Sequence, residues 1–138
     1  MAARFLHHFN IRACEAEVLA LRDFYRDLIG LMPGPRPPLR SAGFWLYAEG
    51  VPILHLSITP DSEALPAVPE RHSAAGHIAF RCSDYAGTVS RLRQRDVPHS
   101  IVHVVPTNEV QIFLQDPSGV GVELNFAQAE LAQEKHDA

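Results

Sequence analysis

Cysteine is scarce in this sequence: Cys14 and Cys82 are its only two, and they do not form a C-x-x-C pair. This usage fits a reducing compartment better than a disulfide scaffold, so we expect two free thiols and a cytoplasmic protein. Long apolar runs are also missing. No segment approaches the roughly 18 apolar residues that a membrane span requires, and the first ten residues do not have the apolar stretch of a signal peptide. We therefore expect no membrane partner.

Positive charge is in equally short supply. The chain has 12 Lys and Arg against 16 Asp and Glu, a formal net charge of −4, and its basic residues are scattered. A nucleic-acid surface requires a basic patch, so no nucleic-acid partner is expected. Apolar residues, by contrast, make up 46% of the chain, which is typical of a globular protein. A length of 138 residues is enough for one domain with its own core.

The two halves of the chain repeat one order of expected elements. In the first half, alternation and helical periodicity predict a strand at 5–11, a helix at 15–30, and strands at 43–48 and 51–58, with the proline-rich loop "PGPRPP" between the helix and the second strand. In the second half they predict a strand at 76–82, a shorter helix, and strands at 100–105, 110–115 and 119–126. We therefore expect one domain, 1–138, composed of module one (4–58), a linker (59–75), module two (76–126) and a tail (127–138).

Four candidate metal ligands recur at matched intervals. His8 precedes His55 by 47 residues, and His77 precedes Glu123 by 46, so each half begins and ends with one of them. Alternation places each on the less apolar face of its strand. Imidazole and carboxylate donors suit a divalent transition metal, and we expect one such ion per site: Fe, Ni, Zn, Co or Mn. The alternative is that each is an ordinary strand residue with a hydrogen-bond or salt-bridge partner.

Aromatic residues and an arginine accompany these candidates. Trp45 lies ten residues before His55, and Phe113 lies ten residues before Glu123. Together with Tyr47 they fall on the ligand-bearing face, where they form either a wall for a substrate or ordinary sheet packing. Arg81, in "HIAFR", is either a solvated strand end or a substrate-binding residue.

The segments "LHHFNIR", "LRDFYRDLIGL", "GHIAFR" and "FLQDPSGVGVELNF" resemble the successive signatures of the vicinal oxygen chelate superfamily. That superfamily includes glyoxalase I, methylmalonyl-CoA epimerase, extradiol dioxygenases, fosfomycin-resistance transferases and bleomycin-binding proteins. The resemblance covers nearly the whole chain except the linker and the tail. It implies an α+β fold in which two tandem βαβββ modules form a curled mixed sheet around a metal-binding cavity. The family's ligand positions correspond to His8, His55, His77 and Glu123.

The resemblance implies more than one activity. A four-ligand site favours isomerase or lyase chemistry on a small oxygen-chelating substrate, with Glu123 as the catalytic base. His55 departs from the Glu or Gln that glyoxalase I and the epimerase have there. A three-ligand site without His55 implies an Fe(II) extradiol-type dioxygenase, and a bleomycin-resistance-like binding protein is the third alternative. The resemblance also implies a homodimer, in which the site forms within one chain or across two.

Overall fold

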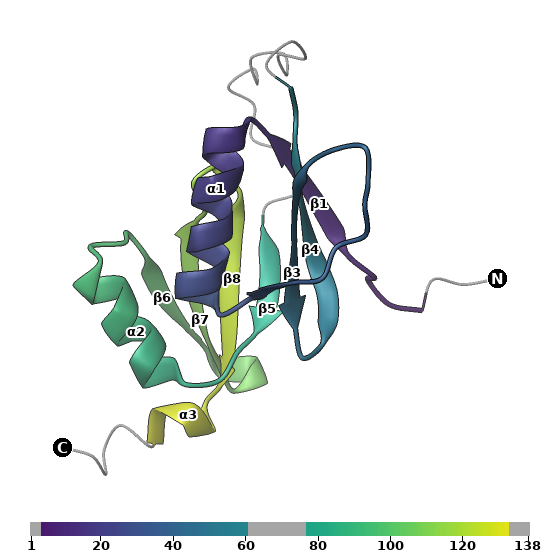
Figure 1. Cartoon of the computed structure of the whole chain (residues 1–138). Coiled ribbons are helices and arrows are strands. Elements are labelled where there is room, and N and C mark those ends of the chain that lie inside the picture. Colours follow the sequence, from purple (N-terminus) through teal and green to yellow (C-terminus); the bar gives the residue numbers. More distant parts are fainter. Residues whose placement is uncertain (1–3, 61–76, 133–138) are drawn as a thin grey trace. The chain divides into compact units, whose positions relative to one another are not determined.

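The computed structural model describes residues 4–60 and 77–132. The chain forms two compact units, Met1–Arg71 and His72–Ala138, which contain module one and module two (Figure 1). Each unit carries one four-stranded mixed sheet and one long helix. The expected α+β fold of two tandem βαβββ modules is therefore confirmed. Most of the expected linker lies outside the described residues. No helix in the described ranges is long and apolar enough to cross a membrane.

Module one contains β1 (Phe9–Ala13), α1 (Glu15–Phe24), the π-helical turn η1 (Tyr25–Ile29), β2 (Met32–Gly34), β3 (Gly43–Ala48) and β4 (Val51–Ile58). Its strand order is β1-β4-β3-β2, with β1 parallel to β4 and the other pairs antiparallel. The helix forms where periodicity predicts it, because Val18, Leu21, Tyr25 and Leu28 come round to one buried face. Gly30, with φ of 87°, ends it in the left-handed conformation.

Module two repeats this topology with β5 (Ile78–Arg81), α2 (Tyr85–Gln94), β6 (Ser100–Val104), the 3₁₀ turn η2 (Val105–Thr107), β7 (Glu109–Gln115), β8 (Gly121–Ala127) and α3 (Ala129–Ala132). The strand order is β5-β8-β7-β6, again with the first pair parallel. Asp84 caps α2 by accepting a hydrogen bond from the backbone N–H of Gly87 at 3.1 Å. Tyr85 anchors the helix against Phe126 of β8, with ring centroids 5.4 Å apart.

Two elements differ from the sequence-based expectation. The short strand β2 lies where the proline-rich loop was predicted to begin, and it includes Pro33. An edge strand tolerates proline because one side of its backbone needs no partner. The short helix α3 falls in the predicted tail. The first strand also begins later than predicted, at Phe9, so His8 directly precedes β1 just as His77 directly precedes β5.

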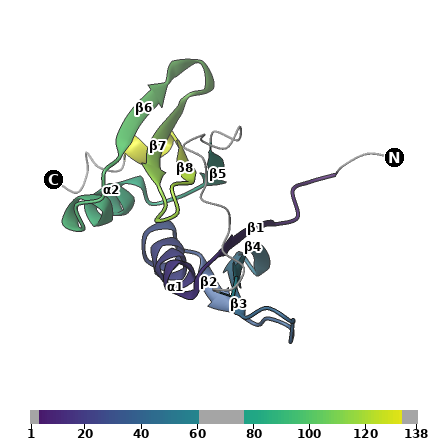
Figure 2. The same cartoon turned by 90° about the horizontal axis from the view of Figure 1, so that it is seen from above.

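Each sheet has one apolar face and one face that carries the candidate ligands. In β4, Leu54 and Leu56 are fully buried and His55 between them is half-buried. The helix α1 packs against this sheet (Figure 2), and buried apolar side chains of the helix and the sheet form the core of module one. In β8, Val122 and Leu124 form the corresponding apolar row. Glu123 is different, because it is buried too, although it points to the opposite face.

Candidate metal-binding site

In module two, His77 and Glu123 are in direct contact. His77 Nε2 lies 2.7 Å from Glu123 Oε2. The parallel pairing of β5 with β8 sets Ala79 opposite Glu123, so His77, two residues earlier, reaches the same face diagonally. The Glu123 side chain is 8% exposed and that of His77 is 44% exposed. A buried carboxylate requires a partner to offset its desolvation, and the imidazole is one such partner.

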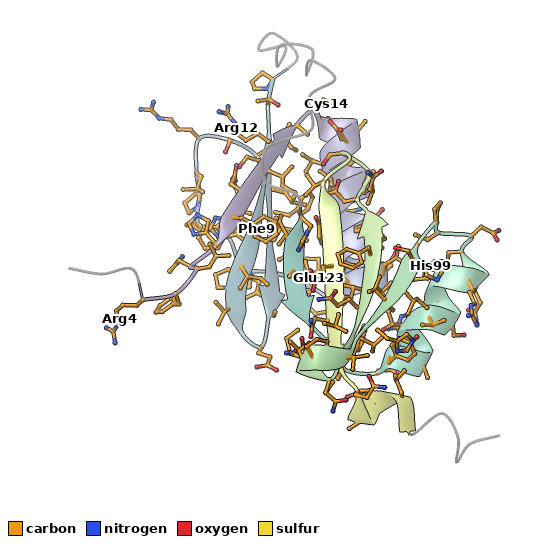
Figure 3. The ribbon with its side chains drawn as sticks, turned by 180° about the vertical axis from the view of Figure 1, so that it is seen from behind. Arg4, Phe9, Arg12, Cys14, His99 and Glu123 are labelled. Carbon is orange, nitrogen blue, oxygen red and sulfur yellow. The ribbon has the colours of Figure 1, made fainter. Side chains whose placement is uncertain are left out.

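The second oxygen of Glu123 is also engaged. Gln111 Nε2 donates to Glu123 Oε1 at 2.7 Å, and Asn125 Nδ2 lies 3.4 Å from the same oxygen. Figure 3 shows Glu123 on β8, an inner strand of the sheet, with side chains of the adjoining strands around it. Phe113, directly opposite Glu123 on β7, meets the His77 ring edge-on with centroids 5.6 Å apart. Both carboxylate oxygens therefore have partners within module two.

In module one, the equivalent positions hold a stack of three rings. The rings of His8 and His55 are stacked with centroids 4.0 Å apart and planes 16° apart. Trp45 covers the other side of His55 at 4.1 Å and 7°. The register explains this, because Trp45 and Asn10 lie on either side of His55 in the neighbouring strands and His8 precedes Asn10 by two. Burial lowers the pKa of His55, and the nearby His8 lowers it further. The neutral imidazole that a metal requires is thus favoured.

In module one, one ring nitrogen of His55 and one of His8 already have a hydrogen-bond partner. His55 Nε2 lies 3.1 Å from the carbonyl oxygen of Pro52, so its N–H donates there and Nδ1 remains as the free nitrogen. His8 Nδ1 lies 2.8 Å from His7 Nδ1, which leaves His8 Nε2. A metal lies in the plane of an imidazole that binds it. Because the two rings are stacked, their planes do not converge on one point, and a shared ion requires at least one ring to turn.

Two predicted substrate-binding residues have other partners. The hydroxyl of Tyr47 donates to the carbonyl oxygen of Pro35, and its ring packs over Gly34 of β2. Arg81 is 62% exposed and pairs with Glu109 of β7. The hydrogen bond from Arg81 lowers the pKa of Glu109. Trp45 and Phe113, in contrast, lie directly against candidate ligands.

The structure therefore brings the four candidate ligands together as two pairs. Within residues 4–60 and 77–132, no three His, Cys, Asp or Glu side chains gather in one metal-binding group. Each module supplies a pair: His8 with His55, and His77 with Glu123. The donor atoms are nitrogen and carboxylate oxygen, which fit a divalent transition metal. The nitrogen and oxygen of the second pair face each other at 2.7 Å, which is hydrogen-bonding distance.

Sequence interpretation missed Gln111 and Asn125. A signal for both was available, since strand alternation places Gln111 on the face of Phe113 and Asn125 on the face of Glu123. Polar residues beside a buried carboxylate are its natural hydrogen-bond donors.

A family model described as the Glyoxalase/Bleomycin resistance protein/Dioxygenase superfamily matches residues 6–124. Similar solved structures include a lactoylglutathione lyase from Agrobacterium tumefaciens, with 22% identity, a TM-score of 0.61, and coverage of 94% of this chain and 98% of that chain. A glyoxalase/dioxygenase from Nostoc punctiforme is 19% identical, with a TM-score of 0.65 and coverage of 90% and 91%. The antibiotic-binding protein TnmS3 from Streptomyces sp. CB03234 is 22% identical, with a TM-score of 0.59 and coverage of 92% and 98%. At these identities the likeness is one of fold. A search of curated proteins finds no significant match.

Proposed function

Because the chain belongs to the glyoxalase/bleomycin resistance protein/dioxygenase superfamily, we propose that it is a divalent-metal-dependent enzyme acting on a small oxygen-chelating substrate. Isomerase- or lyase-type chemistry is the form we favour. The observation that carries the proposal is the contact of 2.7 Å between His77 and the buried carboxylate of Glu123, together with the imidazole pair at the equivalent positions of module one.

We assign the metal to His8, His55, His77 and Glu123, with Fe, Ni, Zn, Co or Mn as the ion. When bound, a divalent ion polarises a substrate oxygen and stabilises negative charge that develops on it. Glu123 is the catalytic base: its carboxylate accepts a proton from carbon next to the polarised oxygen. The low exposure of Glu123 supports this role, since a base shielded from water keeps its proton from exchanging with solvent.

Trp45 and Phe113 are proposed to line the substrate site, because each contacts a candidate ligand. Tyr47 and Arg81 are proposed as more distant substrate contacts, and both must leave or share their present partners, Pro35 and Glu109, to act there. The two modules belong to one functional domain in this proposal.

A second candidate function is an Fe(II) extradiol-type dioxygenase. One observation favours it. His55 lies between two rings, and its Nε2–H donates to the carbonyl oxygen of Pro52. These are also the contacts of a histidine with a structural role and no metal. Without His55 the ligands are His8, His77 and Glu123, the two-histidine, one-carboxylate set of non-haem iron oxygenases. A metal-free small-molecule binder in the same superfamily is the remaining alternative.

Elemental analysis separates these classes. Untagged protein after gel filtration is expected to carry about one divalent transition ion per site, or to take one up from added Ni, Zn, Mn, Co or Fe. Absence of any uptake would leave only the binding protein. Oxygen consumption with a catechol in the Fe(II) form, but not in the Zn or Ni form, would identify the dioxygenase.

We also propose that the chain works as a homodimer in the cytoplasm. Light scattering is then expected to give about twice the 15.3 kDa of one chain. A monomer that still binds metal at full strength would exclude a site that needs two chains.

A further inference from the structure

We propose that Gln111 is a positioning residue, whose side-chain amide fixes the carboxylate of Glu123 so that Oε2 is the oxygen presented to His77 and to a bound ion. The hydrogen bond from Gln111 Nε2 to Glu123 Oε1 measures 2.7 Å. On the other oxygen, Oε2, the contact to His77 also measures 2.7 Å. This inference rests on the proposed function, because it assigns a task within the same site.

The strand register explains why Gln111 can do this. Phe113 lies directly opposite Glu123, and Gln111 lies opposite Asn125. Gln111 therefore sits diagonally from Glu123 on the same face, a position that a long side chain spans. Only the amide nitrogen of glutamine can donate to a carboxylate, so the contact determines how the amide is turned.

Asn125 is the other amide near Glu123, but its contact is weaker and divided. Its Nδ2 lies 3.4 Å from Glu123 Oε1 and 3.4 Å from Glu109 Oε2. A donor at that distance, shared between two carboxylates, restrains neither strongly. Glu109 is itself held by Arg81. The short, undivided hydrogen bond to Glu123 comes from Gln111.

Module one provides an internal comparison. Gly43 occupies the position of Gln111 there, because Gly43 pairs with Ser57 and Trp45 with His55 in the same register. A Cβ at position 43 would come within 1.9 Å of the carbonyl oxygen of Leu56, so no side chain fits. Module one has an imidazole at the ligand position, and the amide beside it, that of Asn10, donates to Ser57 Oγ at 2.9 Å. The amide that donates to a candidate ligand is in the module that has the carboxylate.

The chemical consequence is a preorganised oxygen donor. A free carboxylate rotates about its last bond and presents either oxygen. With Oε1 held by Gln111, that freedom is removed before a metal arrives, and a fixed ligand binds more tightly than one that must be ordered on binding. Gln111 itself touches neither metal nor substrate in this assignment.

The test compares Gln111→Met with Gln115→Met. Methionine has a similar length but cannot donate a hydrogen bond. Gln115 is a matched control, because it lies on the same face of β7 but is exposed, and it pairs with Gly121 of β8 whereas Gln111 pairs with Asn125. Calorimetric titration with Co(II) is expected to show affinity about 10- to 100-fold lower for Gln111→Met, with a changed Co(II) absorption spectrum. Gln115→Met is expected to match the wild type. Equal affinities and spectra in all three proteins would overturn the proposal.

Two further measurements test the proposal if Gln111→Met does not fold or if the wild type binds no metal. If Gln111→Met fails to fold, Gln111→Asn keeps an amide that is one methylene too short, and the same loss of Co(II) affinity is expected. If the wild type binds no metal, the proposed function fails, but the positioning role is still testable in the metal-free protein. There the ¹⁵N signals of the His77 ring are expected to lose their hydrogen-bonded Nε2 signature in Gln111→Met and to keep it in Gln115→Met. An unchanged His77 signature would show that Gln111 positions nothing.

Discussion

In module one the candidate ligand His55 is held between two flat rings, whereas in module two Glu123, at the equivalent strand position, is held by hydrogen bonds at both oxygens. The stacked His55 ring has one hydrogen bond to lose on turning, from Nε2 to the carbonyl oxygen of Pro52, and a neutral hydrogen bond contributes about 0.5 to 1.5 kcal/mol. A buried carboxylate that loses a hydrogen bond is left with an uncompensated charge, which costs more. We infer that module two presents a fixed donor and module one an adjustable one.

This difference gives the two pairs different tasks in the proposed enzyme. The atoms of His77 and Glu123 already face each other across 2.7 Å. His8 and His55 do not converge, because their rings are stacked. The His77–Glu123 pair is therefore expected to need less rearrangement on metal binding than the His8–His55 pair, in which a ring must turn. Substitutions in the two modules should then differ in how far they lower metal affinity and in which other properties they change.

Glu123→Gln is expected to have the largest effect. It keeps the shape but removes the carboxylate charge, so metal affinity is expected to fall by more than about 100-fold, beyond what losses around a ligand cause. Catalytic activity is expected to be lost as well, because the base is gone. Isothermal titration with Zn(II) or Co(II) measures the first effect. Glu109→Gln is the control, since Glu109 shares the sheet face but pairs with Arg81; an equal loss there would mean that overall charge, not ligation, is responsible.

His55→Ala is expected to have the next largest effect, about 10- to 100-fold on metal affinity, with the fold intact. Trp45 is the only tryptophan in the chain and stacks on His55, so its fluorescence is expected to change when metal is added to the wild type. In the variant that response should disappear. His103→Ala, at an exposed strand position of module two, is the control.

A different result for His55→Ala would change the assigned chemistry. If metal affinity is unchanged while stability falls by about 1 to 3 kcal/mol, His55 is structural. The site then has three ligands, His8, His77 and Glu123, and the dioxygenase becomes the favoured function.

The comparison also shows what the sequence could and could not predict. Strand alternation and the matched intervals predicted equivalent positions for the candidate ligands in the two modules, because equal spacing in a repeated topology gives equal register. They could not predict how the rings of His8 and His55 are turned, which depends on contacts with Trp45 and Pro52. Gln111 was missed for a related reason. A search for repeated residues overlooks a side chain whose counterpart is Gly43. Pro33 concealed β2, since proline predicts a loop more often than an edge strand.

The third effect is on the pH dependence of stability and concerns His55 of module one. Burial, followed by the charge of His8, lowers the pKa of His55, so protonation favours the unfolded chain, whose histidines titrate near their ordinary value of about 6.5. Stability from neutral His55 is therefore present above that value and lost as the pH falls through it. Between roughly pH 7.5 and 5.5, the thermal midpoint of the metal-free wild type is expected to fall further than that of His55→Gln. Parallel curves for the two proteins would contradict this.

The last effect, which does not involve the candidate ligands, concerns the two cysteines, which occupy equivalent places directly after β1 and β5. Cys14 is exposed at the start of α1, whereas Cys82 is partly buried and its Sγ lies 3.7 Å from the carbonyl oxygen of Phe80. Burial raises the pKa of Cys82 to about 11. Since only the thiolate reacts, and each pKa unit changes its fraction tenfold, Cys82 is expected to react roughly 100-fold more slowly than an ordinary thiol near neutral pH. Titration of the folded protein with a disulfide reagent should show one fast thiol per chain. Cys14→Ser should abolish the fast phase and Cys82→Ser should preserve it, and two fast thiols in the wild type would show that module two does not shield its cysteine.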